Sequence, residues 1–215
     1  MDMKHLFVCR MVHIDNVPFI VKNGLWAKMS DVNDPCFRAI GNPDIIGKRT
    51  DKPVGVVPPD GVLGEFVPFY FSGHSPMLYN IVTGYGVPKI PQRDIVFLIC
   101  DVMEMIEAGL QYCFTDGNAT KSITRFYNSI EEMRELDWMT IKATVWKNTE
   151  DDYDRVRKKM AEFLVKRHVP ASLIRAIVVK SPDVGRQIEE LVAGVLTDCT
   201  VKVDTKFEYY YRGYD

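Results

Sequence analysis

Runs of apolar residues recur along the chain at lengths typical of β-strands. The most continuous run covers residues 94–100 and is typical of a strand at the centre of a sheet. Shorter runs, bounded by glycine, proline or charged residues, predict further strands. The predicted strands are 6–9, 66–71, 94–100, 110–114, 162–165, 174–179, 201–203 and 207–211.

Helical periodicity is clearest near the C-terminus. There the spacings of four, three, one and three residues place one set of side chains on a single helix face, namely Val184, Ile188, Leu191, Val192 and Val195. Capping residues predict helices over 15–24, 75–82 and 101–109. Residues 122–136 and 151–160 also have helical character, and 138–146 are ambiguous. Residues 26–59 contain five prolines and are too irregular for a long element.

The order of these elements indicates the fold class. Strands and helices are mixed without a regular βαβ rhythm, which favours α+β over a doubly wound sheet. The chain has 215 residues, of which 47% are hydrophobic and 26% charged, as in ordinary globular proteins. We therefore expect a single domain over residues 1–215.

Charge and cysteine usage restrict the function. The formal net charge is -2, so any site for a polyanion must be local. Five cysteines without a C-x-x-C pair, and four histidines without metal-ligand spacing, argue against a metal site. No export signal and no apolar run of about 18 residues is present, so we expect a cytoplasmic protein with no membrane segment.

The common nucleotide and hydrolase motifs are absent. The chain has no P-loop, and Gly84-Tyr85-Gly86 lacks the third glycine of a dinucleotide fingerprint because Lys89 occupies that place. G-x-S-x-G and H-E-x-x-H are missing as well. Walker-type, Rossmann and these hydrolase chemistries are unsupported.

One acidic residue has an unusual sequence context. Glu162 lies between the basic run that ends at Lys159 and the apolar run 163–165. A carboxylate at the start of a strand entering a core needs either a partner or a cleft. Its simplest interpretation is an ion pair with Lys166 or Arg157, and the alternative is a functional acid.

Four segments, spread over most of the chain, carry a family resemblance. In chain order they are His13-Ile14-Asp15-Asn16 with Gly24-Leu25, Val67-Pro68-Phe69-Tyr70-Phe71 with Ser75-Pro76-Met77-Leu78-Tyr79, Phe114-Thr115-Asp116, and Ala161-Glu162-Phe163-Leu164-Val165. Together they resemble the corresponding blocks of the DarT family, toxins that ADP-ribosylate DNA. The resemblance implies an ADP-ribosyltransferase fold: a split, strongly curved mixed sheet with flanking helices, and NAD+ bound in its cleft as substrate without a metal.

The resemblance also implies catalytic residues. Glu162 matches the family's catalytic glutamate, which would stabilise the positive charge that develops on the ribose when nicotinamide leaves. Arg49 matches a functional arginine that contacts NAD+; Lys48 is a competing candidate. On the sequence alone, Arg49 is a surface loop residue.

Further residues are implied for binding. Arg10-Met11-Val12 stands where the family has H-I-T, whose main chain holds the nicotinamide amide, so a histidine side-chain role does not carry over. The expected NAD+ site comprises Arg10, Met11, Val12, His13, Asn16, Phe19, Ala27, Arg49, Tyr70 and Met77. His13 and Asn16 could instead be structural, and Tyr70 and Met77 could be core residues. The expected DNA-binding residues are Asn118, Trp146, Tyr153, Arg155 and Arg157, most of them in an acceptor loop over 137–160.

The implied function is a toxin that transfers ADP-ribose from NAD+ to a base in single-stranded DNA, with a DarG-like macrodomain antitoxin as partner. Two other functions stay open. One is an RNA-acting relative such as an NAD-dependent RNA 2′-phosphotransferase, and the other is a catalytically silent nucleic-acid-binding or protein-binding module of the same fold.

Overall fold

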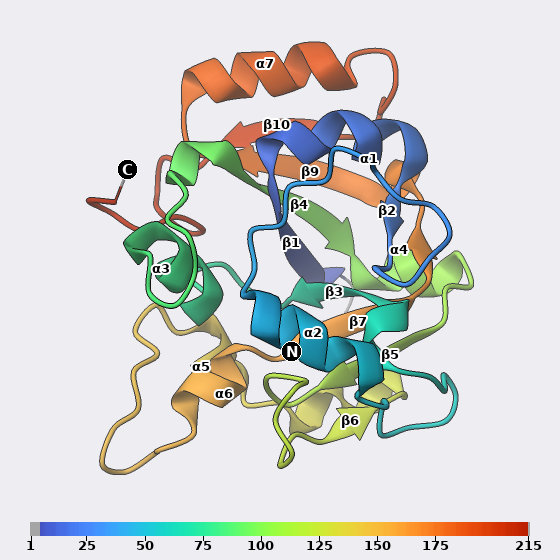
Figure 1. Ribbon diagram of the computed structural model, residues 1–215, viewed down its shortest axis with the longest axis vertical. Coiled ribbons are helices and arrows are strands. Elements are labelled where there is room, and N and C mark those ends of the chain that lie inside the picture. Colours follow the sequence, from blue (N-terminus) through green and yellow to red (C-terminus); the bar gives the residue numbers. More distant parts are fainter. Residues whose placement is uncertain (1–4, 215) are drawn as a thin grey trace.

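A computed structural model describes residues 5–214, so the first four residues and Asp215 of the expected domain lie outside the described residues. Its main feature is an eight-stranded sheet in the order β10-β9-β4-β1-β3-β7-β5-β6 (Figure 1). Neighbouring strands are antiparallel except for the parallel pair β9 and β10. The strands are β1 (Phe7–His13), β3 (Phe66–Tyr70), β4 (Ile95–Asp101), β5 (Tyr112–Thr115), β6 (Phe126–Tyr127), β7 (Glu162–Lys166), β9 (Ile174–Val179) and β10 (Thr200–Val203), with β2 (Leu25–Trp26) and β8 (His168–Val169) forming a separate small sheet.

The sheet is split between β1 and β3. β1 pairs with β4 along its whole length, from Phe7 to His13. Within the described residues β1 meets β3 at one position, Cys9 opposite Tyr70, beyond which the two strands diverge. The expected α+β class and the split mixed sheet are therefore confirmed.

Helices cover both faces of the β1-β4-β9 part of the sheet. On one face, α1 (Val17–Asn23) and α7 (Pro182–Val192) pack on alternate residues of these strands. On the other face, α3 (Pro76–Thr83) and the buried Tyr210 cover the remaining alternate residues. The other helices are α2 (Pro43–Asp51), α4 (Val102–Glu107), α5 (Trp138–Lys142) and α6 (Arg155–Lys159), and the short 3-10 turns are Ile14–Asn16, Leu63–Glu65, Gln92–Asp94, Ile130–Glu135 and Ala171–Leu173.

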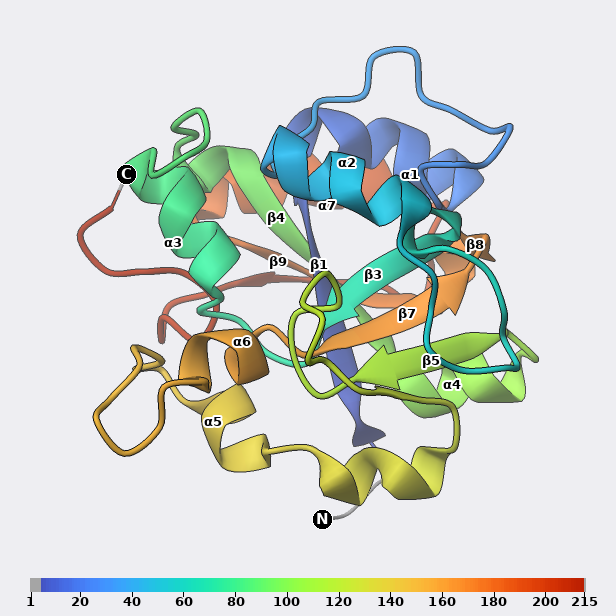
Figure 2. The ribbon, with the colours of Figure 1, turned by 60° about the horizontal axis from the view of Figure 1, so that its bottom comes forward.

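The expectation that residues 26–59 hold no long element is wrong. The nine-residue helix α2 forms there because the Asn42 side chain accepts the backbone N–H groups of Asp44 and Ile45, and Pro43 occupies the first helical position. None of the residues described for α2 is buried. The helix packs against the 3-10 turn Leu63–Glu65, which leads directly into β3 (Figure 2).

The expected helix over 122–136 is also wrong. Phe126–Tyr127 instead pairs with β5, and the chain becomes helical only over the 3-10 turn Ile130–Glu135. Asp116 closes the intervening turn, since its carboxylate accepts the backbone N–H of Arg125. Tertiary strand pairing here outweighs local helix propensity. In the expected helix 151–160, only Arg155–Lys159 is helical.

The expected last strand, 207–211, is a loop. The Asp204 carboxylate accepts the backbone N–H groups of Glu208, Tyr209 and Tyr210, which curls the chain. Tyr210 is then buried, and its hydroxyl donates toward the carbonyls of Ile95 and Val178. This loop covers the face of the sheet on which α3 packs.

None of the helices described for residues 5–214 combines the length and the hydrophobicity needed to cross a bilayer.

Candidate active site

Glu162 is the first residue of β7 and is 2% exposed. Its backbone N–H donates to the Thr115 hydroxyl at 3.0 Å. One carboxylate oxygen, Oε1, accepts the backbone N–H of Ala119 at 3.0 Å, and the other, Oε2, accepts a hydrogen bond from Arg49 at 2.8 Å. A buried carboxylate with both oxygens engaged is held in one orientation.

The partners proposed for Glu162 by the simplest interpretation of the sequence are elsewhere. Lys166 binds the side chain and carbonyl of Asp60. Arg157 pairs with Asp116 and Asp154. That interpretation is corrected: the ion pair exists, but its cation is Arg49, which is 113 positions away in the sequence.

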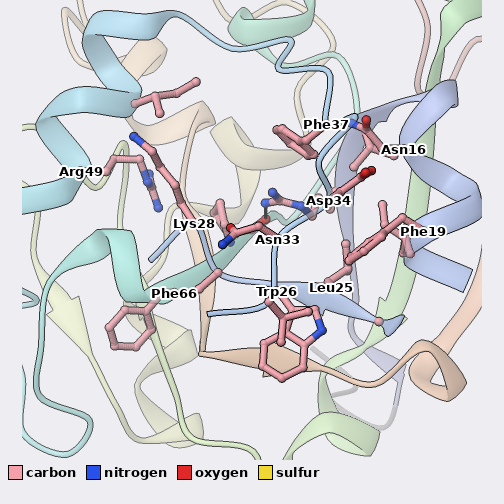
Figure 3. Close-up of a pocket in the computed structure, with 18 of the residues that line it drawn as sticks. Asn16, Phe19, Leu25, Trp26, Lys28, Asn33, Asp34, Phe37, Arg49 and Phe66 are labelled. Carbon is pink, nitrogen blue, oxygen red and sulfur yellow. Dashed lines mark hydrogen bonds between the residues drawn. The ribbon is translucent and has the colours of Figure 1, made fainter. Parts of the chain in front are cut away.

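Arg49 projects from α2 into the cleft (Figure 3). Its side chain is 14% exposed, and its second terminal nitrogen, Nη2, is buried without a hydrogen-bond partner among residues 5–214. Lys48, the competing candidate, is exposed. The structure thus brings Arg49, and not Lys48, to Glu162.

Arg10 lies on β1 and reaches across the split in the sheet. One of its terminal nitrogens donates to the carbonyl of Pro68 on β3 at 2.9 Å. Its Nε is buried and has no partner in the part of the chain that the structure describes. Burial, followed by the nearby positive charge of Arg49, lowers the pKa of Arg10 to about 10, so it still carries its charge at neutral pH.

A pocket of about 260 Å³ is lined by Arg10 and Arg49, and Glu162 lies behind Arg49 without lining it. Since a cavity of about 150 Å³ holds benzene, the pocket takes a substantial part of a dinucleotide rather than all of it. In Figure 3, Arg49 and Lys28 lie at one end, with Asn16, Phe19 and Phe37 at the other. Of the ten residues expected for the NAD+ site, six line it: Arg10, Val12, Asn16, Phe19, Ala27 and Arg49.

Sequence reasoning missed much of the pocket wall. Trp26, Lys28, Asn33, Asp34 and Phe37 all line it. Trp26 ends the two-residue strand β2 and the others follow in an irregular segment, where no periodicity indicates which side chains face inward. The Asn42-Pro43 cap was a usable signal for α2, but no comparable signal marked these residues.

Four residues expected at the NAD+ site do not line the pocket. Met11 faces the opposite side of β1, in the core under α3. Tyr70 and Met77 pack against the same core, with the Tyr70 hydroxyl 3.5 Å from the Met77 sulfur. Tyr70 pairs with Glu162 in the sheet; burial, followed by the Glu162 charge, raises the pKa of its phenol, so it is a neutral neighbour of the carboxylate.

His13, the fourth, has the structural role considered as its alternative. It is 3% exposed, and its Nδ1 accepts the backbone N–H of Asp15 at 3.1 Å. Burial, together with the charge of Arg38, lowers its pKa from the usual 6.5. His13 is therefore uncharged at pH 7 and caps the 3-10 turn Ile14–Asn16.

The turn after β5 holds Asn118, one of the expected DNA contacts. Asn118 is 6% exposed and its side-chain oxygen accepts from both the backbone and the hydroxyl of Thr120. The turn delivers the neighbouring Ala119 N–H to Glu162. The side chain of Asn118 thus shapes the active-site turn.

The other expected DNA contacts differ in accessibility. Tyr153 is 76% exposed. Trp146 is half-buried and donates its indole N–H to the Tyr211 hydroxyl, while Arg155 donates to the carbonyl of Val145. Arg157 is 11% exposed and engaged by two carboxylates, so its guanidinium is not free for a phosphate.

A buried lysine at the end of α6 binds the end of α5 and the residues after β3, and the sequence did not indicate this role. Lys159 is 3% exposed, and its ammonium donates to the carbonyls of Ile141 and Ala143 and to the hydroxyl of Ser72. Burial lowers its pKa to about 8. These bonds tie the end of α5 to the end of β3, next to the strand that carries Glu162.

Comparison with known proteins gives consistent results. Residues 9–211 match the DarT family, described as ssDNA thymidine ADP-ribosyltransferase. A DNA ADP-ribosyl transferase of Escherichia coli is 34% identical over 95% of this chain and 93% of its own length. A fusion of a DNA ADP-ribosyl transferase with a DNA ADP-ribosyl glycohydrolase, from Thermosipho africanus, is 29% identical over 85% of this chain and 44% of its length.

Solved structures of a Thermus DarT are similar to this fold. Its complex with ADP-ribosylated ssDNA has a TM-score of 0.87 and 32% identity, covering 96% of this chain and 97% of that one. Its complex with NAD+ has a TM-score of 0.80 and 31% identity, covering 96% and 98% of the two chains.

Proposed function

The chain belongs to the DarT family of ssDNA thymidine ADP-ribosyltransferases, and on this premise we propose that it transfers ADP-ribose from NAD+ to thymidine in single-stranded DNA. Nicotinamide is the second product. The observation that carries the proposal is the Glu162 carboxylate, fixed by the Ala119 N–H and by Arg49 and joined through Arg49 to the pocket. Residues 1–215 act as one ADP-ribosyltransferase domain.

The chemistry follows from the charge that develops on the ribose. The bond from C1′ to the nicotinamide nitrogen breaks with its electron pair leaving on nicotinamide, so C1′ becomes positively charged. A fixed carboxylate stabilises this centre, because its orientation needs no reorganisation during the reaction. Each carboxylate oxygen of Glu162 has a second lone pair, so Glu162 also accepts a ribose hydroxyl while keeping its present bonds.

Arg49 supports the same step as a charge and not as a proton acceptor. A guanidinium stays protonated in proteins, so it cannot remove the proton that the base loses when the new C1′–N bond forms, and this proton passes to water. It positions Glu162 through one nitrogen, and its Nη2, which has no partner within residues 5–214, donates to the substrate.

Single-stranded DNA is the substrate that costs less to bind. Base pairing in a duplex occupies the ring N–H of thymine, and extruding the base costs a few kcal/mol. We assign the recognition of the strand to residues 137–160, with the exposed Tyr153 as a stacking residue and with Trp146 and Arg155 as further contacts.

A glycohydrolase partner completes the proposal. The Thermosipho africanus relative joins both activities in one chain. We infer that this chain is the toxin of a toxin-antitoxin pair in the cytoplasm, and that a DarG-like macrodomain glycohydrolase removes its mark. Co-expression tests this: growth arrest caused by the chain is relieved by an active glycohydrolase and not by an inactive one.

The transfer itself is tested with NAD+ labelled in its ADP-ribose part. Oligonucleotides of matched sequence are compared as single-stranded DNA with one thymidine, the same strand without thymidine, duplex DNA and RNA. We expect label on the thymidine-containing single strand. Label on RNA supports an RNA-acting transferase instead, and no label on any of them supports a silent binding module.

A further inference from the structure

We propose that the Arg10 side chain binds the diphosphate of NAD+, beside Arg49; this inference rests on the proposed function. One nitrogen of Arg10 donates to the carbonyl of Pro68, and the side chain so anchored lines the pocket. The anchored group has a rigid planar fork of donors, a shape suited to phosphate oxygens.

Two unpaired donors point to the ligand. The Nε of Arg10 and the Nη2 of Arg49 are both buried, both lack a partner among residues 5–214, and both residues line one pocket. A buried donor without an acceptor is costly, and native proteins rarely leave one unpaired. Acceptor atoms brought by a ligand would satisfy both.

The charge in the pocket selects an anion. Arg10, Lys28 and Arg49 each bring a positive charge, while Asp34 brings a negative one. Glu162 already neutralises Arg49, and one Asp34 oxygen is bound to the backbone N–H of Cys36. Among residues 5–214, no carboxylate lies within salt-bridge distance of the Arg10 guanidinium, and Glu162 acts on it only at longer range.

NAD+ offers a single anionic group for this charge. Its nicotinamide amide is neutral and its ribose hydroxyls are uncharged, whereas the diphosphate carries two negative charges. Hydrogen bonds between two charged groups are stronger than those between neutral groups. The Arg10 guanidinium therefore contributes most to the binding free energy of NAD+ when it contacts the diphosphate.

The test compares ligands with and without the diphosphate. Calorimetry on the purified protein measures the Kd of ADP-ribose, which has a diphosphate, and of nicotinamide, which has none. For Arg10→Met we expect ADP-ribose to bind about 10- to 100-fold more weakly, with nicotinamide binding unchanged within about twofold. Arg10→Lys, which keeps the charge but loses the Nε–H, should weaken ADP-ribose binding by about tenfold and covers the case in which Arg10→Met does not fold.

Arg93→Met is the matched control, because Arg93 is 72% exposed and does not line the pocket. Unchanged ADP-ribose binding in both Arg10 variants overturns the inference, as does an equal loss for nicotinamide. A wild-type protein that binds neither ligand contradicts the proposed function itself, so the two failures are distinguishable.

Discussion

Replacing Glu162 by glutamine tests the central carboxylate with little change of shape. The glutamine oxygen still accepts the Ala119 N–H, while the charge facing Arg49 is lost. Removing one partner of a fully buried ion pair costs roughly 3–5 kcal/mol. Arg49 is 14% exposed on a helix without buried residues, so it can turn toward solvent, and we expect a loss of only about 1 kcal/mol in the free energy of unfolding.

The expected effect on the rate is much larger. Opposite unit charges about 4 Å apart attract by about 4 kcal/mol at an effective dielectric constant of about 20. Because each 1.4 kcal/mol or so is a factor of about ten, losing the Glu162 charge should slow transfer about a thousandfold. The carboxylate thus contributes far more to the transition state than to the fold.

Single-turnover transfer of labelled ADP-ribose to the thymidine-containing strand measures this rate, and urea unfolding measures the stability. Glu104→Gln is the matched control, since it breaks the pair with Arg175 outside the cleft. Transfer by Glu162→Gln at more than a tenth of the wild-type rate would refute the reasoning. An unfolded variant would instead show that Glu162 is chiefly structural.

Three further predictions follow from neighbouring residues. Arg49→Met should slow transfer about a hundredfold while Lys48→Met changes it less than twofold, and the reverse result would assign the role to Lys48. The pKa of His13 is lowered by burial, so the folded chain resists the proton that the unfolded chain takes up. The free energy of unfolding should therefore fall as the pH drops below about 6.5; His13→Asn should flatten that slope in urea titrations. Arg157→Met should reduce kcat about tenfold, because the Arg157 guanidinium braces the turn whose backbone N–H holds Glu162; an unchanged kcat with a lower Tm would leave it a stability residue.

The sequence alone determined the elements whose residues carry their own signal. The continuous apolar run predicted the central strand Ile95–Asp101, and the 3.6-residue periodicity predicted the helix Pro182–Val192. Glu162 was recognisable because an acid at the start of an apolar strand conflicts with its surroundings. These signals are local, so no tertiary contact was needed to detect them.

Only the tertiary structure decided which distant residues meet. By its sequence context Arg49 is a surface residue, and only the packing of α2 against the turn before β3 brings its charge to Glu162. The Asp204 carboxylate converts a strand-like run into a loop, and the carbonyl of Pro68 accepts a hydrogen bond from Arg10 across the split in the sheet. In each case the deciding partner is a single polar atom whose position depends on packing between strands, and no local pattern of side chains encodes that position.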